Sequence, residues 1–326
     1  MKRVKISSTG SYVPKDVLTN FDLEKMVDTS DEWITTRTGI KERRIASKDE
    51  ATSDMVIKAS LKALEKANLR PKDLDMIIIA TVTPDTLFPA TACWVQKGLG
   101  IKEIPAFDIS AACTGWIYGL VVAESLIKTG IAHRILLVGT EMLTKIVNWE
   151  DRNTCVLFGD GAGATILEES NDESGILASY LASDGNLGDL LIQPAGGTRM
   201  PASFETVKNK LHSITMKGNE VFKHAVKNMG DAAIKVLKRA NLKGEDIDIF
   251  IPHQANIRII ESTVERAKIP IEKTYINIDK YGNMSSATIP IALDELNDNG
   301  KLKKGKLVLV DAFGAGFTWG AVIIRW

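Results

Sequence analysis

The sequence predicts an α/β fold, a five-layer α/β/α/β/α sandwich made of two similar halves. Three observations predict it: an internal repeat, apolar strands that alternate with helices, and two uncharged helices that require burial. The chain has 326 residues, of which 44% are hydrophobic and 25% are charged. This length and composition allow a large buried core.

The repeat relates residues about 173 positions apart. Residues 66–79 read KANLRPKDLDMIII and match residues 239–252, RANLKGEDIDIFIP, at an offset of 173. Residues 134–139, RILLVG, match residues 306–311, KLVLVD, at an offset of 172. Two matches at nearly one spacing indicate a duplication. We therefore predict an N-terminal half over residues 1–172 and a C-terminal half over residues 173–326.

Helix and strand patterns alternate within each half. Ile57, Leu61 and Leu64 have helical spacing, as do the apolar residues of 222–236. Each helix leads through an Asn-Leu turn into an apolar strand, at 76–82 or at 249–252. These strands are apolar on both faces, as buried parallel strands must be. The alternation predicts layered α/β architecture with right-handed crossovers.

Two further helices are expected at the centre of the sandwich. Residues 113–123 carry no charge before Glu124, and residues 283–293 carry none before Asp294. A helix that is apolar all round is buried. The offset between the halves falls to 157 at residues 163–166, so the first half carries 172 − 157 = 15 extra residues within 142–158. We expect this insertion to cover a site.

The charge balance and the cysteines limit which partners, metal sites and cellular locations can be expected. Lys+Arg and Asp+Glu each number 41, so the net charge gives no reason to expect nucleic-acid or membrane binding. The longest uncharged stretch, 109–123, is short for a membrane span, and the N-terminus lacks the apolar run of a signal peptide. Cys93, Cys113 and Cys155 lack metal-ligand spacing. We expect reduced thiols, no metal and a cytoplasmic location.

Three segments place reactive side chains where apolar segments meet turns. Cys113 opens an apolar helix, whose dipole should lower the thiol pKa and favour the thiolate. His253 ends a strand at the sheet edge where α/β folds place their sites, and its counterpart in the repeat is Ala80. Asn283 lies near the position in the second half that Cys113 holds in the first. Pseudo-symmetry should bring these residues together, and the set fits acyl transfer through a thioester.

Each of the three residues alone also fits a structural role. A free cysteine is commonly a small buried hydrophobe, a histidine at a strand end can be a hydrogen-bonded core residue, and asparagine commonly caps a helix or occupies a turn. Two glycine-rich segments, 158–163 and 313–316, lack the ending of a P-loop and run into strands, so we expect no nucleotide-phosphate site there. Backbone N–H groups at 314–316 could instead form an oxyanion hole with that of Cys113.

The chain resembles the β-ketoacyl-[acyl-carrier-protein] synthase III family of the thiolase superfamily. The resemblance runs almost end to end, over GSYVP 10–14, DEWI 31–34, RTGI 37–40, AC 112–113, FGDGAG 158–163, PHQAN 252–256, GN 282–283 and FGAGFTWG 313–320. It implies the thiolase-like duplicated sandwich and a homodimer. It also implies decarboxylating Claisen condensation of an acetyl-type acyl-CoA primer with malonyl-[acyl-carrier-protein]. The products would be 3-oxoacyl-[acyl-carrier-protein], CoA and CO2, at the start of type II fatty acid synthesis.

The resemblance also implies roles for individual residues, with acyl-CoA as a substrate and no cofactor. Cys113 would carry the acyl group, and His253 and Asn283 would donate hydrogen bonds to the malonyl thioester. The N–H groups of Cys113 and Ala315 would form the oxyanion hole. CoA would meet Trp33, Arg37, Arg152, Gly218, Phe222, Ala255 and Asn256. The carrier protein would meet Lys223, Gln254, Ala255, Asn256, Ile257 and Arg258. The acyl pocket would include Trp116, where the family usually has Phe, and Phe88, reaching the other subunit.

Three other interpretations fit part of the sequence. A related acyl-CoA condensing enzyme of secondary metabolism would share the cysteine, histidine and asparagine. A papain-like cysteine hydrolase has the same three residue types in the same order, but the duplication argues against it. A catalytically silent binding protein would not be expected to keep all three reactive positions. A fourth class, the chain-elongating synthases, has a second histidine at the position of Asn283, and this difference argues against that class.

Overall fold

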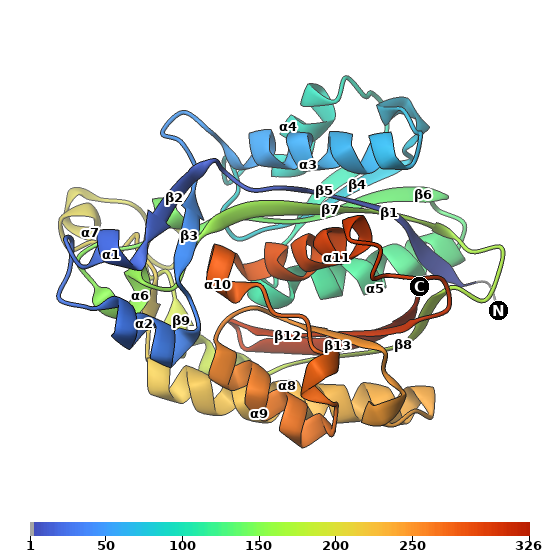
Figure 1. The fold of residues 1–326 in the computed structure, drawn as a ribbon. Coiled ribbons are helices and arrows are strands. Elements are labelled where there is room, and N and C mark those ends of the chain that lie inside the picture. Colours follow the sequence, from blue (N-terminus) through green and yellow to red (C-terminus); the bar gives the residue numbers. More distant parts are fainter. Residues whose placement is uncertain (1–2) are drawn as a thin grey trace.

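The computed structural model describes residues 3–326 and confirms the predicted α/β sandwich (Figure 1). Two sheets face each other across a pair of central helices, and further helices cover the outer face of each sheet. Within the described residues, no helix is both long and apolar enough to cross a membrane.

The first sheet has the strand order β1-β7-β6-β4-β5. Its strands are β1 (Val4–Tyr12), β7 (Asp160–Glu169), β6 (Arg134–Met142), β4 (Met76–Ala80) and β5 (Ala106–Ile109). β4 pairs in parallel with β5 and β6, while β7 is antiparallel to β6 and β1. Helices α3 (Thr52–Lys66) and α4 (Thr91–Gly98) cover the outer face. Ile77 and Ile79 pack in the outer core cluster and Ile78 in the central one, so both faces of β4 are buried.

The second sheet repeats this arrangement with the strand order β11-β12-β13-β8. Its strands are β11 (Ile249–Pro252), β12 (Leu307–Gly314), β13 (Thr318–Arg325) and β8 (Gly175–Ser183). β11 is parallel to β12, and β13 is antiparallel to both β12 and β8. Helices α8 (Gly218–Ala240) and α9 (Ile257–Ala267) cover its outer face. β4, β6, β7 and β1 thus correspond in order to β11, β12, β13 and β8, and we propose the boundary of the halves at residues 172–173.

The central helices are α5 (Gly115–Lys128) and α11 (Thr288–Asp298). Each follows a short 3₁₀ turn, η2 (Ala112–Thr114) or η7 (Ser285–Ala287). Both helices contribute to one buried cluster between the sheets. A Cβ at Gly139 of β6 would lie 2.2 Å from the backbone oxygen of Ser286, so glycine is required for η7 to lie this close to the first sheet.

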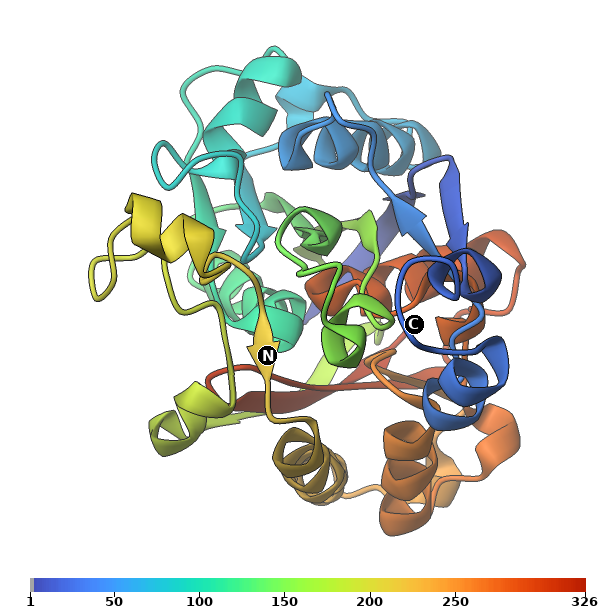
Figure 2. The same ribbon diagram turned by 90° about the vertical axis from the view of Figure 1, so that its left-hand side faces the viewer.

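Shorter elements gather at one end of the sandwich, which lies at the left in Figure 1 and faces the viewer in Figure 2. They include β2 (Asp16–Thr19), α1 (Asn20–Leu23), α2 (Asp31–Thr38), β3 (Glu42–Ile45), α6 (Arg152–Cys155), β9 (Leu191–Ile192), α7 (Phe204–Lys208), β10 (Thr215–Met216) and α10 (Ile278–Tyr281). The remaining 3₁₀ turns are η1 (Pro71–Asp73), η3 (Leu143–Lys145), η4 (Gly185–Leu190), η5 (Gly244–Asp246) and η6 (Ile271–Lys273). The predicted insertion, 142–158, therefore forms η3 and α6.

A buried arginine fastens the insertion to the antiparallel strand pair β2–β3. The Arg43 side chain has no exposed surface, and its Nη2 donates to the oxygen of Val156 at 2.8 Å and to Asn20 Oδ1 at 2.9 Å. Its Nη1 donates to the oxygen of Leu18 at 3.0 Å. Burial lowers the pKa of Arg43 to about 10, which leaves the guanidinium charged at neutral pH. These hydrogen bonds hold the segment that leads into Phe158.

We expect Asp311 to destabilise the fold at neutral pH. Its carboxyl group is fully buried in β12, and neither oxygen has a partner among residues 3–326. Burial raises its pKa well above the ordinary 3.8, so the carboxyl group destabilises the fold least below that pH, where it is protonated in both states, and destabilises it increasingly as the pH rises toward the folded-state pKa. Asp311→Val should raise the unfolding free energy at neutral pH by ~1–3 kcal/mol. Urea denaturation at several pH values measures this, and a less stable variant at neutral pH would contradict it.

Candidate active site

Two adjoining cavities meet at Cys113. The first, called here the channel, has a volume of about 120 Å³ and is lined by Cys113, His253 and Asn283 together with the N-terminal part of α8. The second, called here the inner cavity, has a volume of about 200 Å³ and shares Cys113 and Phe158 with the channel. The three residues singled out in the sequence thus line one cavity, although they come from the end of β5, the end of β11 and the approach to η7.

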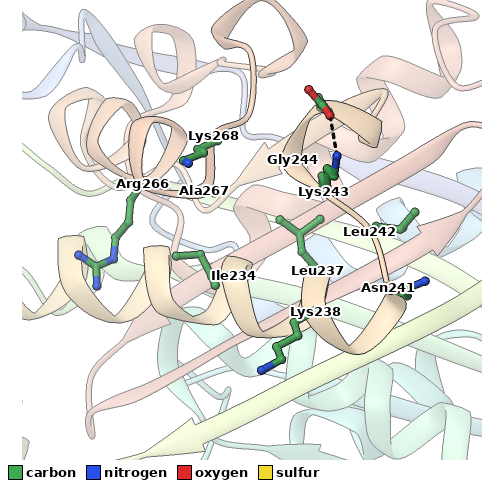
Figure 3. A pocket seen from close by; sticks show the side chains of 11 residues that line it. Ile234, Leu237, Lys238, Asn241, Leu242, Lys243, Gly244, Arg266, Ala267 and Lys268 are labelled. Atoms are coloured by element: carbon green, nitrogen blue, oxygen red, sulfur yellow. Dashed lines mark hydrogen bonds and ion pairs between the residues drawn. The ribbon is translucent and has the colours of Figure 1, made fainter.

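A larger hollow of about 730 Å³ lies elsewhere, between the C-terminal ends of α8 and α9 (Figure 3). Four cations line it: Lys238, Lys243, Arg266 and Lys268. Lys243 pairs with Glu245 at 3.5 Å, and Arg266 pairs with Asp231. The channel, in contrast, borders the opposite end of α8, and the larger hollow contains none of the three reactive residues.

Cys113 is presented by a strained turn. Ala112 has a φ of 46°, in the left-handed region that non-glycine residues rarely adopt. Ser285, at the same position of η7, has a φ of 48°. The two turns are therefore equivalent in conformation as well as in sequence offset. Cys113 corresponds to Ser286, and Asn283 lies just before the repeated turn.

The prediction of a lowered thiol pKa is wrong. Burial, with a smaller contribution from the nearby Glu141 carboxylate, raises the pKa of Cys113 to about 12. A hydrogen bond with the Ser285 side chain acts in the opposite direction but is weaker than the desolvation. The resting residue is consequently a thiol, and a group that takes its proton is needed when the sulfur attacks.

Two backbone N–H groups lie beside the thiol. The N–H of Cys113 precedes the first hydrogen bond of η2, which runs from Thr114 N to the oxygen of Ala111 at 3.2 Å. A Cβ at Gly314 would lie 2.6 Å from Cys113 N, so glycine lets the end of β12 approach the thiol closely. Ala315 follows and lines the inner cavity with Cys113. Among residues 3–326, no backbone oxygen accepts a hydrogen bond from the N–H of Cys113 or of Ala315.

His253 is buried and neutral, because desolvation lowers its pKa to about 3. Its Nδ1 lies 2.7 Å from Thr288 Oγ1, whereas that hydroxyl lies 3.1 Å from the oxygen of Ser285. The Thr288 hydroxyl has a single proton, which it can donate either to the Ser285 oxygen or to Nδ1 but not to both. When the Thr288 hydroxyl donates to Nδ1 instead of to the Ser285 oxygen, the ring proton resides on Nε2, and this is the form of His253 that can donate into the channel. Nε2 has no partner among the described residues.

The side chain of Asn283 also presents hydrogen-bond donors to the channel. Its Oδ1 accepts a hydrogen bond from the backbone N–H of Ser285 at 2.8 Å, so its NH2 group remains for a ligand. Its backbone is tied to the insertion, through N–H donation to Leu157 at 2.9 Å and acceptance from Gly159 at 3.1 Å. Asn283 and His253 therefore both offer hydrogen-bond donors to the channel.

The predicted CoA residues form two groups. Gly218, Phe222, Ala255 and Asn256 line the channel. Trp33, Arg37 and Arg152 do not line it, but both guanidinium groups lie over the Trp33 ring, 5.3 Å and 5.2 Å from its centroid. Asn256 connects the groups, because its Nδ2 donates to the backbone oxygen of Arg37 at 2.9 Å.

The residues predicted to meet a carrier protein are mostly accessible, with one exception. Lys223 and Arg258 are exposed, and Arg258 lies over the Phe222 ring at 5.2 Å. Gln254 is only 1% exposed. Its side chain donates to the oxygens of Pro252 and Tyr275 and accepts from the Asn277 N–H. Gln254 therefore cannot meet a docking protein, since its polar atoms are used to hold the end of β11.

The acyl-pocket prediction for Trp116 also requires correction. Trp116 is 1% exposed, packs in the central core cluster, and donates from Nε1 to Thr165 Oγ1 at 3.3 Å. It lines neither the channel nor the inner cavity, because its helix turns it away from Cys113 toward β7. Phe88 is 86% exposed in the loop after β4, which leaves it available to a second subunit.

The sequence interpretation missed three residues that contact the reactive groups. Thr288 holds His253, Ser285 holds Asn283 and Cys113, and Glu141 accepts a hydrogen bond from Ser285 at 3.2 Å. Two signals were available: the Ser-Ser pair at the start of an apolar helix, and a carboxylate in the otherwise apolar strand 134–142.

Comparison with known proteins agrees with this geometry. Family models described as 3-oxoacyl-[acyl-carrier-protein] synthase III match residues 107–185 and, for the C-terminal part, 237–326. A β-ketoacyl-[acyl-carrier-protein] synthase III from Caldanaerobacter subterraneus subsp. tengcongensis is 60% identical over 98% of this chain and 97% of its own. The chain belongs to the β-ketoacyl-[acyl-carrier-protein] synthase III family. It is thus an acyltransferase of the condensing type.

Solved structures of the synthase III family share the whole fold. The 3-oxoacyl-[acyl-carrier-protein] synthase III of Aquifex aeolicus is 52% identical, with a TM-score of 0.92 over 99% of this chain and 100% of that one. The priming β-ketosynthase of the R1128 polyketide pathway is 32% identical, with a TM-score of 0.90 over 99% and 96%. The comparisons confirm the thiolase-like fold and exclude the papain-like hydrolase.

We expect Thr288 to determine which nitrogen of His253 carries the proton. In ¹⁵N NMR of histidine-labelled protein, wild-type His253 should show the neutral Nε2–H form. It should not titrate across the neutral range, because burial lowers its pKa to about 3. Thr288→Val should lose the preference for Nε2–H, whereas Thr288→Ser should keep it. An Nδ1–H signal in the wild-type protein would contradict the assignment.

Proposed function

We propose that this chain condenses an acetyl-type acyl-CoA primer with malonyl-[acyl-carrier-protein] and so initiates type II fatty acid synthesis. The products are 3-oxoacyl-[acyl-carrier-protein], CoA and CO2. One observation carries the proposal: a thiol and two hydrogen-bond donors, from Cys113, His253 and Asn283, line one channel. The family membership supports the same reaction.

The first half-reaction acylates the thiol. The Cys113 sulfur attacks the primer thioester, and the oxygen that becomes negative is stabilised by the N–H groups of Cys113 and Ala315. CoA then leaves through the channel. The primer's acyl chain occupies the inner cavity, which is lined largely by apolar residues such as Leu143, Ile146 and Phe158.

The second half-reaction uses the two donors. Malonyl on its carrier enters the channel, and its thioester oxygen accepts hydrogen bonds from His253 Nε2–H and the Asn283 NH2 group. Loss of CO2 then gives an enolate whose charge these neutral donors stabilise, so no strong base and no cofactor are required. The carbon attacks the acyl-Cys113 thioester and releases the 3-oxoacyl product.

We infer the remaining contacts from the positions of the predicted residues. CoA would lie along Asn256, Phe222 and Gly218, with its adenine on Trp33 and its phosphates near Arg37 and Arg152. The carrier protein, which is acidic, would meet Lys223, Ile257 and Arg258 at the channel mouth. In a homodimer, the exposed Phe88 would close the acyl pocket of the second subunit.

A condensing enzyme of secondary metabolism is the second candidate. The likeness to the R1128 priming synthase favours it, but relatives at 50–60% identity over the whole chain carry the synthase III name. Condensation assays with malonyl-[acyl-carrier-protein] and malonyl-CoA separate the two. The proposed function requires a clear preference for the carrier-bound substrate.

Replacement of Asn283 should separate the half-reactions. Asn283→Ala removes a donor to the enolate oxygen but leaves the thiol and the oxyanion N–H groups in place. Acyl transfer from acetyl-CoA to Cys113, followed by intact-protein mass spectrometry, should therefore persist. Formation of 3-oxoacyl product should fall by ~10²–10³-fold, as for loss of one donor to a developing oxyanion. Cys113→Ala, which forms no adduct, is the control, and normal condensation by Asn283→Ala would refute the role.

Loss of the Trp33 ring should weaken CoA binding without slowing the chemistry. Stacking of a base on an aromatic ring is worth ~1–3 kcal/mol, so Trp33→Ala should raise KM for acyl-CoA by roughly 10-fold at little changed kcat. Trp94→Ala is a matched control, because Trp94 also lies beneath a cation, Lys97 at 5.5 Å, but on α4. Equal KM values for both variants would argue against adenine stacking on Trp33.

A further inference from the structure

The proposed mechanism leaves one buried carboxylate unexplained. Glu141 lies at the end of β6 with no exposed surface. Its oxygens accept hydrogen bonds from Thr83 Oγ1 at 2.6 Å, from the Val82 N–H at 3.2 Å and from Ser285 Oγ at 3.2 Å. Longer contacts come from the hydroxyls of Thr81, at 3.3 Å, and Ser286, at 3.4 Å. No cation pairs with it among residues 3–326, so hydroxyl and amide donors alone surround this acid.

Ser285 connects this carboxylate to the nucleophile. The Ser285 side chain lines the inner cavity together with Cys113, and its hydroxyl acts to lower the pKa of the thiol. The same hydroxyl donates to Glu141. The Ser285 hydroxyl therefore stands beside the Cys113 thiol in the inner cavity and is hydrogen-bonded to a carboxylate oxygen on its other side.

The groups that face the channel cannot take the thiol proton. In the proposed function, Nε2 of His253 carries the proton that it donates to the malonyl thioester oxygen, so this nitrogen has no lone pair for the thiol proton. The Asn283 amide presents only N–H donors. Burial raises the pKa of Glu141 to about 7 against the effect of its hydrogen bonds, so this carboxyl group can both accept and release a proton near neutral pH.

We propose that Glu141, acting through Ser285, takes the thiol proton when Cys113 is acylated and returns it to the sulfur when the product leaves. The inference rests on the proposed function and extends it to the proton balance. Glu141 is a positioning and proton-holding residue, because it acts on the sulfur only through the serine hydroxyl.

The balance closes over the two half-reactions. In acylation, the S–C bond to Cys113 forms as the thiol proton passes to Ser285 and the serine proton to Glu141. The C–S bond to CoA breaks, and the CoA thiolate takes a proton from solvent. In condensation, the C–C bond forms, and the acyl C–S bond breaks with its electron pair remaining on Cys113. Glu141 returns its proton through Ser285, so each turnover consumes one solvent proton.

The test is the rate of acyl-adduct formation on Cys113 with acetyl-CoA, measured by rapid quench and intact-protein mass spectrometry. Glu141→Gln and Ser285→Ala should each slow it by ~10²-fold or more, as for loss of a general base. The double variant should be little slower than the slower single variant, because the two residues act as one unit. Glu295→Gln is the matched control. Glu295 also accepts three side-chain hydrogen bonds, from Tyr275, Tyr281 and Asn277, but it lines neither cavity at Cys113.

The pH profile distinguishes a proton-holding role from a structural one. The titratable groups that line the two cavities are Cys113 and His253, and Cys113 is the one that interacts with Glu141. Wild-type acylation should rise with pH and level off once Glu141 is ionised. In Glu141→Gln the rate should continue to rise in the alkaline range as the thiolate fraction grows.

Each outcome decides the proposal. A wild-type rate of acylation in Glu141→Gln or Ser285→Ala, or a pH profile that Glu141→Gln leaves unchanged, would overturn it while the proposed function stands. If Glu141→Gln fails to fold, Ser285→Ala decides alone. Absence of an acyl adduct on the wild-type protein with any acyl-CoA primer would instead remove the proposed function itself.

Discussion

The contact of the 3₁₀ turn η7 with strands β4 and β6 of the first sheet is the constraint on which the site depends. Ser286 Oγ donates to the oxygen of Ala80 at 2.8 Å, and its backbone oxygen lies where a Cβ of Gly139 would be. These contacts seat the second half against the strand ends of the first. Because Ser285 begins that turn and Asn283 lies just before it, the same contact brings an amide and a hydroxyl close to the sulfur of Cys113.

Desolvation decides the charge state of the reactive groups. It raises the pKa of Cys113 and Glu141 and lowers that of His253, so the thiol and the imidazole are both neutral at rest. A neutral site suits a reaction in which negative charge appears only briefly on oxygen and sulfur. Fixed donors then stabilise that charge without holding a permanent counter-ion that would bind the starting thioester equally well.

The sequence patterns predicted the helices and strands and the way in which they form layers. The repeat at 173 residues predicted the matching sheets, and the apolar runs predicted strands buried on both faces. The corrected residues depend on tertiary contacts instead. The prediction from the helix dipole at Cys113 took no account of desolvation. Gln254 and Trp116 were predicted to lie at a surface or a pocket, but the side chains that pack around them bury them, and these neighbours cannot be read from the local sequence. Thr288, Ser285 and Glu141 were missed because their hydrogen bonds join segments up to 144 residues apart.

The paired left-handed turns limit how much substrate one chain can hold. The position in η7 that matches the nucleophile is Ser286, whose hydroxyl is already engaged with a carbonyl of the opposite half. In the first half, the residue that corresponds to His253 is Ala80, which has no imidazole. Two copies of the architecture consequently yield one attachment point, so the loading stoichiometry is a single acyl group per polypeptide.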